Sequence, residues 1–124
     1  MYSNGYNAYR ANSVNYASKE QLLLMLVDGA VKFAKVASQA ILDKDIQKAH
    51  DNIIKTEEIF TELKITLDTT AGKWAEDLFE IYGFINQKLF EANIKISKEV
   101  MDEIIPLIEE IRDMWYEAER ISKM

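Results

Sequence analysis

Residues 17–30 read ASKEQLLLMLVDGA, and this stretch decides where the first helix begins and how it packs. Ser18 and Gln21 have the spacing of a capping box, in which each side chain bonds the other residue's backbone N–H, so a helix starts here. Residues 22–27 are apolar without a break, which is more than a helix with one face toward a core requires. Gly29 lies inside the helical pattern and predicts the close approach of another backbone. We therefore expect part of this helix's apolar surface to be covered by something other than its neighbouring helices.

The composition indicates one all-α domain. Of 124 residues, 48% are apolar, and the 4 glycines and 1 proline are too few for the turns of a β-sheet protein. A formal net charge of −6 argues against nucleic acid or an anionic membrane as partner, since both require clusters of Lys and Arg. The sequence contains no cysteine, which excludes disulfides and thiolate chemistry. Because no apolar run reaches the roughly 18 residues of a membrane span and no signal peptide is recognisable, we expect a cytoplasmic protein.

Residues 1–17 predict a flexible N-terminal arm ahead of a helical bundle domain at residues 18–124. The arm has one charged residue, Arg10, and contains four of the six tyrosines: Tyr2, Tyr6, Tyr9 and Tyr16. A frayed terminus is one interpretation. The one we favour is docking on the bundle, because a tyrosine ring gains from burial while its hydroxyl still finds a partner.

Apolar residues at helical spacing predict four helices, at about 19–41, 46–67, 73–94 and 98–121. The second has the clearest pattern, with spacings of three and four between its inward positions: Ile46, Ala49, Ile53, Thr56, Phe60, Leu63 and Leu67. Four segments of similar length joined by short loops pack as an antiparallel up-down four-helix bundle. Pro106 removes a backbone hydrogen bond inside the last segment, so we expect that helix to be kinked or split there.

The first and third helices carry more apolar residues than one inward stripe can hold. In the first, the residues outside the stripe are Leu23, Leu24 and Val27. In the third, the predicted stripe is Trp74, Leu78, Ile81, Ile85, Leu89 and Ala92, and the aromatic residues off it are Phe79, Tyr82, Phe84 and Phe90. Bundles bury much of what looks spare on a helical wheel, and Ile85 and Leu89 fit either core or groove. As a set, the excess indicates an oligomer interface or a groove for an amphipathic partner.

No catalytic or metal-binding pattern is present. A di-iron bundle needs Glu-x-x-His pairs from two helices, and the single histidine, His50, is preceded at that spacing by Gln47. His50 is therefore interpreted as a surface or half-buried helix residue. No Gly-x-Ser-x-Gly elbow and no Gly-rich phosphate loop occurs. We expect no enzyme activity, no cofactor and no metal.

Several motifs together resemble the flagellin-specific export chaperones of the FliS family. They are Val14 to Ser18, the leucine-methionine run at 22–25, Asp28-Gly29-Ala30, Leu78 to Tyr82, Glu91-Ala92-Asn93 and Ile111 to Trp115. The resemblance covers nearly the whole chain, and the Asp-Gly-Ala and Glu-Ala-Asn motifs are its more specific parts. This sequence departs from the family pattern at Tyr16, Lys19, Val27 and Pro106, where the family commonly has Thr, Pro, Tyr and a residue other than proline.

The resemblance implies a cytoplasmic chaperone that binds the disordered C-terminal region of flagellin. It would block premature polymerisation and deliver the subunit to a component of the export apparatus. We expect the partner to be contacted by Tyr9, Tyr16, Leu23, Val27, Phe79, Tyr82, Leu89, Phe90 and Asn93. The arm tyrosines Tyr6, Tyr9 and Tyr16 would shield the groove until flagellin displaces them.

Two alternatives stay open at this point. Asn93 is either a cap at the end of its helix or a side chain whose amide bonds the client backbone. The bundle is either a chaperone or a protein that uses the same apolar surface to form a homodimer or to bind another amphipathic partner helix.

Overall fold

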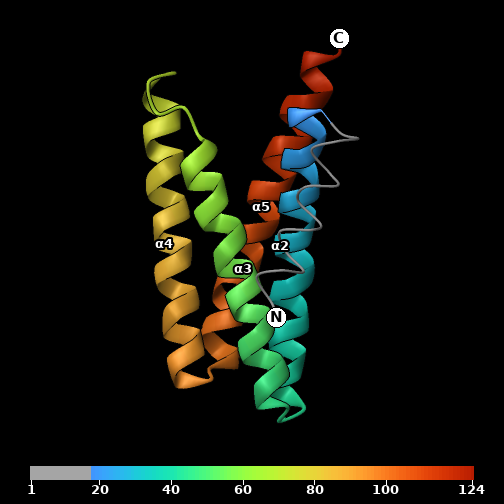
Figure 1. The fold of residues 1–124 in the computed structure, drawn as a ribbon, viewed down its shortest axis with the longest axis vertical. Coiled ribbons are helices and arrows are strands. Elements are labelled where there is room, and N and C mark those ends of the chain that lie inside the picture. Colours follow the sequence, from blue (N-terminus) through green and yellow to red (C-terminus); the bar gives the residue numbers. More distant parts are fainter. Residues whose placement is uncertain (1–17) are drawn as a thin grey trace.

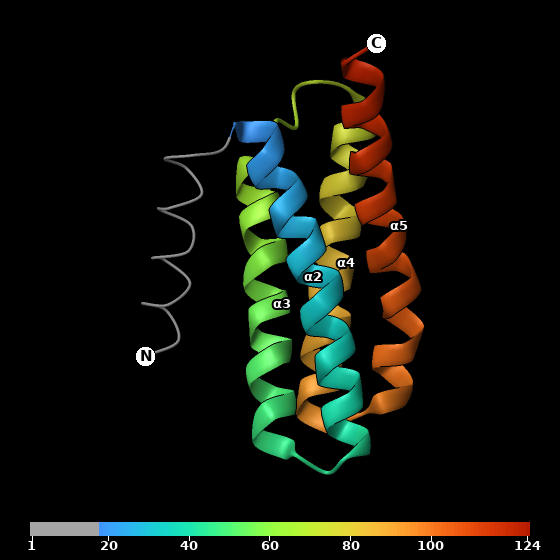
Figure 2. The ribbon, with the colours of Figure 1, turned by 90° about the vertical axis from the view of Figure 1, so that its right-hand side faces the viewer.

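The structure is a computed structural model that describes residues 18–124, so the predictions for Tyr9, Tyr16 and the rest of the arm lie outside the described residues. It contains the helices α2 (Lys19–Leu42), α3 (Ile46–Thr66), α4 (Lys73–Lys95) and α5 (Lys98–Ser122). Successive helices run in opposite directions (Figure 1), and each packs against its two neighbours in a ring, α2 on α3, α3 on α4, α4 on α5 and α5 on α2 (Figure 2). The predicted antiparallel four-helix bundle is confirmed.

Side-chain caps lie directly before three of the helices, at or next to the predicted helix starts. Ser18 and Gln21 form the capping box of α2, with distances of 3.1 Å and 3.0 Å for its two hydrogen bonds. Asp45 accepts from the Lys48 N–H at the start of α3, and Ser97 accepts from the Val100 N–H at the start of α5. Such bonds satisfy backbone donors that have no partner within the helix. These caps therefore fix where the three helices begin.

The positions of α3 that were predicted to face inward form part of the core. Ala49, Ile53, Thr56, Phe60 and Leu63 are all buried, whereas Ile46 is exposed at the first turn. The hydroxyl of Thr56 donates to the Asn52 carbonyl oxygen at 2.8 Å, which removes the penalty of burying that polar group. The heptad spacing of this helix was therefore a sufficient guide to its inward face.

Pro106 does not divide α5. The helix is continuous from Lys98 to Ser122, so the alternative of two shorter helices is wrong. Pro106 is exposed, and its ring faces solvent where no neighbouring helix crowds it. The helix tolerates the missing N–H because buried residues on both sides of Pro106, including Ile104 and Ile108, hold it on the core.

The inward face of α4 is rotated from the predicted one. Its buried residues are Ala75, Leu78, Tyr82, Ile85, Leu89 and Ala92, whereas Trp74 and Ile81 are exposed. The buried residues of α4 have the same spacings of three and four as the buried residues of α3. The prediction placed Trp74 in the core in preference to its smaller neighbour Ala75. The predicted inward face therefore included Ile81 and left out Tyr82.

No helix within residues 18–124 combines the length and the apolar character needed to cross a membrane.

Candidate partner-binding surface

Three of the predicted contact residues lie in the core. Val27, Tyr82 and Leu89 have exposed fractions of only 1%, 1% and 0%. They stabilise the bundle in this arrangement, and their side chains offer no surface to a partner. Val27 is buried because the start of α2 packs against both α3 and α5, so the apolar run there is covered more fully by the bundle than the sequence suggests.

Three other predicted residues, Phe79, Phe90 and Asn93, lie along one edge of α4, next to α3. Positions 79, 83, 86, 90 and 93 repeat at spacings of four and three and therefore share this edge. On α3, positions 50, 54, 57, 61 and 64 have the same spacing and face them. Phe79, Phe90 and Ile54 are 38%, 59% and 39% exposed. We call Ile54, Phe79, Phe90 and Asn93 the α3/α4 strip.

Contacts between the helices fix the register of this strip. At the end nearest the start of α4, the Lys64 ammonium lies 4.9 Å from the centre of the Phe79 ring. In the middle, the Asn86 amide nitrogen donates to the Thr61 hydroxyl at 3.1 Å. The other amide atom, Asn86 Oδ1, is buried and has no hydrogen-bond partner within residues 18–124. A hydrogen-bond acceptor without a donor therefore lies under the exposed apolar residues of the strip.

Asn93 marks the other end of the strip, where its Oδ1 contacts His50 Nδ1 on α3. An amide oxygen only accepts, so in this contact His50 donates from Nδ1. The Asn93 amide nitrogen has no hydrogen bond to any part of the chain that the structure describes. Because α4 continues to Lys95 and is capped by Ile96 in the left-handed region, with φ of 50°, the helix-cap interpretation of Asn93 is wrong.

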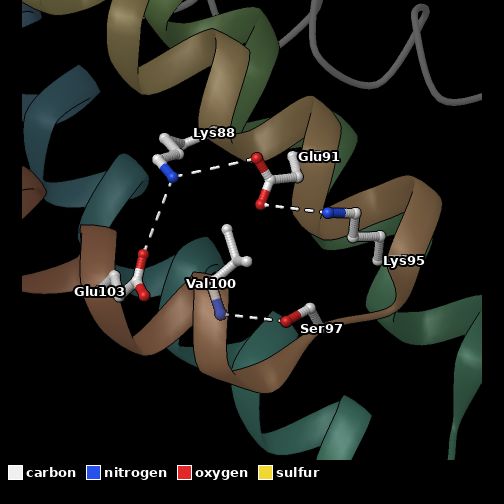
Figure 3. Close-up of polar contacts among 6 residues, drawn as sticks. All are labelled: Lys88, Glu91, Lys95, Ser97, Val100 and Glu103. Atoms are coloured by element: carbon white, nitrogen blue, oxygen red, sulfur yellow. Dashed lines mark hydrogen bonds and ion pairs between the residues drawn. The ribbon is translucent and has the colours of Figure 1, made fainter.

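The three side chains of the Glu91-Ala92-Asn93 motif lie on three different sides of α4. Ala92 is fully buried, and Asn93 faces α3. Glu91 lies on the opposite edge, where Lys88 and Lys95 approach its carboxylate at 3.9 Å and 3.7 Å (Figure 3). Lys88 also approaches Glu103 of α5 at 3.8 Å. Within the motif, Asn93 therefore contacts α3 and Glu91 pairs within α4, while the link to α5 is made by Lys88.

Glu57 adds a partly buried carboxyl to the α3 side of the strip. Burial raises its pKa, and the nearby charge of Glu58 raises it further. Within residues 18–124 no group of histidine, aspartate and glutamate side chains could hold a metal ion.

The structure separates Leu23 from the strip. Leu23 is half-buried and packs against the core on the first turns of α2, away from the seam between α3 and α4. Sequence reasoning missed four residues of the seam, Ile54, Thr61, Lys64 and Asn86. The signal that could have found the three on α3 was a second repeat of three and four, one position on from the core repeat.

Comparison with known proteins agrees with the fold and the motifs. A profile of the family described as flagellar protein FliS matches residues 2–122. The chain belongs to this family. It is 35% identical over 115 residues to the flagellar secretion chaperone FliS of Bacillus subtilis (strain 168), a match that covers 93% of this chain and 86% of the relative. It is 32% identical over 114 residues to the flagellar secretion chaperone FliS of Campylobacter jejuni, covering 91% and 89%.

A solved structure has the same fold at much lower sequence identity. The crystal structure of a flagellar chaperone from bacteria matches with a TM-score of 0.74 and 17% identity, covering 95% of this chain and 97% of that one. As a member of the FliS family this protein is a flagellar secretion chaperone and not an enzyme.

Proposed function

We propose that this FliS-family protein binds the disordered C-terminal region of flagellin in the cytoplasm. Binding would prevent premature polymerisation, and a component of the export apparatus would then receive the subunit. A disordered segment that folds on binding must bury apolar surface to offset its ordering entropy. The α3/α4 strip offers such a surface on a bundle that is already folded.

The observation that carries this proposal is the pairing of exposed apolar side chains with an unused amide donor. Phe90 is 59% exposed between Asn86 and Asn93 on this edge of α4, and Ile54 is 39% exposed on the facing edge of α3. An amphipathic client helix can bury both, as helices do in grooves of this kind. The Asn93 amide nitrogen, held in place by the contact of its oxygen with His50, can donate to a client carbonyl.

Titration with a peptide from a flagellin C-terminal region tests the proposal. We expect saturable binding near one to one by calorimetry, a negative heat-capacity change and a gain of helix by far-ultraviolet circular dichroism. Absence of binding, together with a dimer mass by light scattering, would favour a self-associating bundle.

Two variants locate the site. Asn93→Ala should weaken binding by about 1 kcal/mol, and Phe90→Ala by about 1–2 kcal/mol through loss of buried apolar area. Both should leave the free energy of unfolding nearly unchanged. Ile65→Ala is the matched control, because Ile65 is 72% exposed on α3 outside the strip. If Ile65→Ala weakens binding as much as Phe90→Ala, the client does not bind at the strip.

A further inference from the structure

The helices α4 and α5 are close at one end and separate at the other. Near their connection, Lys88 pairs with Glu103 across the seam (Figure 3). Toward the start of α4 and the end of α5 the two helices diverge (Figure 1). The wider part is bridged by the indole N–H of Trp115, which donates to the Tyr82 hydroxyl at 2.8 Å. Two of the largest side chains in the protein are therefore needed to span this seam.

Apolar side chains line the outside of this wider part. On α4 they are Trp74, Ile81 and Phe84, with exposed fractions of 55%, 36% and 47%. On α5, Met114 and Ile121 are 39% and 55% exposed, and Leu107 is half-buried. We call these six residues the α4/α5 face.

The two sides of the α4/α5 face are in register. Trp74 and Ile81 are seven residues apart, and so are Leu107, Met114 and Ile121. Counting four residues from each member of the Lys88–Glu103 pair leads to Phe84 on α4 and Leu107 on α5. Because a seven-residue repeat keeps side chains on one side of a helix, the face presents two parallel rows to a third helix.

The charges around the α4/α5 face are mainly negative. Its cations are already engaged, since Lys73 pairs with Asp77, Arg120 pairs with Glu117, and Lys88 lies between Glu91 and Glu103. Further carboxylates lie near the face, Glu110 on α5 and Glu80 on α4, and the pKa of Lys73 is raised by Asp77 and further by the charge of Glu80. An apolar surface bordered by more carboxylates than cations complements a helix with one apolar side and flanking Lys or Arg residues.

We propose that the α4/α5 face binds a basic amphipathic helix of a protein partner other than the flagellin segment. A second copy of this chain is disfavoured because its acidic border would meet another acidic border, and the chain carries a net charge of −6. Phe79 and Ile81 are two residues apart on α4, which places them on different sides of that helix. The strip and the face can therefore be occupied together.

A designed peptide tests the proposal, using the full chain and the tryptophan emission of the α4/α5 face. The probe is a tryptophan-free 21-residue helix with leucine at the a and d positions of each heptad and lysine elsewhere. We expect saturable binding that shifts the emission to shorter wavelength, because the probe covers the exposed ring of Trp74. Trp74→Phe should remove the larger part of this shift.

Charge variants show whether the basic probe is bound by the carboxylates beside the α4/α5 face or only by the net negative charge of the protein. The pair Glu80→Lys with Glu110→Lys should weaken binding at least tenfold. The matched pair Asp51→Lys with Glu58→Lys, which makes the same change in net charge on α3, should weaken it less than threefold. Equal losses in the two pairs, or binding without a shift in emission, would overturn the proposal.

Competition distinguishes this inference from the proposed function. The basic probe should bind equally well when a flagellin C-terminal peptide is already present. If the flagellin peptide displaces the probe, the two share one site and the separate face is rejected, while the proposed function stands. If the flagellin peptide does not bind but the probe does, the proposed function fails and the separate face stands.

Discussion

The α2/α3 pair and the α4/α5 pair differ in the size of the side chains that lie between their helices. The core-facing side of α2 contains Ala30, Ala34 and Ala37, all fully buried, and Gly29 lies against Ile59 of α3. The α4/α5 pair instead meets through Tyr82 and Trp115. Small side chains allow close approach of two helices, whereas aromatic side chains hold them apart. One bundle thus contains a tight seam between α2 and α3 and a wide seam between α4 and α5, and the wide seam leaves apolar surface exposed.

The largest expected effect comes from removing the side chain that spans the wide seam. Tyr82 is 1% exposed, and its ring centre lies 5.8 Å from that of Phe60. Tyr82→Ala should lower the free energy of unfolding by about 3–5 kcal/mol, as for other buried aromatic residues. Urea denaturation followed by circular dichroism measures the change. Phe84→Ala, on the exposed side of the same helix, is the control and should cost about 1 kcal/mol or less.

Raising the pH above 10 should lower the free energy of unfolding of the wild-type protein through the same residue, Tyr82. Burial raises the pKa of the Tyr82 hydroxyl to about 12, although the hydrogen bond from Trp115 opposes the rise. In the unfolded chain this group ionises near pH 10. The folded protein therefore holds the proton more tightly. The Tyr82 contribution is fully present below pH 10 and is lost between about pH 10 and 12, amounting to about 2–3 kcal/mol.

Unfolding measured at a series of pH values checks this expectation. Tyr82→Phe should remove the part of the pH dependence that belongs to Tyr82, while other tyrosines continue to titrate. If wild type and Tyr82→Phe lose stability in parallel between pH 10 and 12, ionisation of Tyr82 does not control the seam.

The smallest effects should separate two glycines that both lie inside helices. A Cβ added at Gly83 would meet only the flexible end of Lys64, at 3.7 Å, whereas one added at Gly29 would lie 3.2 Å from Ile59 Cδ1. Gly83→Ala should therefore raise the free energy of unfolding by about 0.5–1 kcal/mol. Gly29→Ala should gain less, because Ile59 must shift. A comparison of the two in thermal unfolding shows whether the α2/α3 seam is as tight as its geometry indicates.

The helices and their caps followed closely from the sequence. Ser18, Asp45 and Ser97 act locally, and the apolar repeat of α3 is regular enough to define its inward face. The face of α4 was harder to predict because Trp74 and Ala75 are neighbours, and hydrophobicity alone favours the larger one. The contacts of Ala75 with the rest of the bundle decide the question, and a single sequence does not contain them.

The contact surface was predicted less completely than the fold. Of the predicted contact residues, Phe79, Phe90 and Asn93 share one edge of α4 in the structure, whereas Val27, Tyr82 and Leu89 are core residues. A helical wheel shows that a residue is off the main stripe. It does not show how wide the buried sector is, which depends on how closely the neighbouring helices pack. The contact of Asn93 with His50 joins two helices and has no local sequence signal.

The ring of helices also sets an order for assembly on the ribosome. The ring closes between α2, the first of these helices to be synthesised, and α5, the last. Closing contacts join Ser38 to Asp102 and Asp28 to Tyr116, which are 64 and 88 residues apart in sequence. A nascent chain that has released α2, α3 and α4 still exposes the side of α2 that α5 covers. Quality-control factors should therefore encounter an unfinished bundle until α5 leaves the exit tunnel.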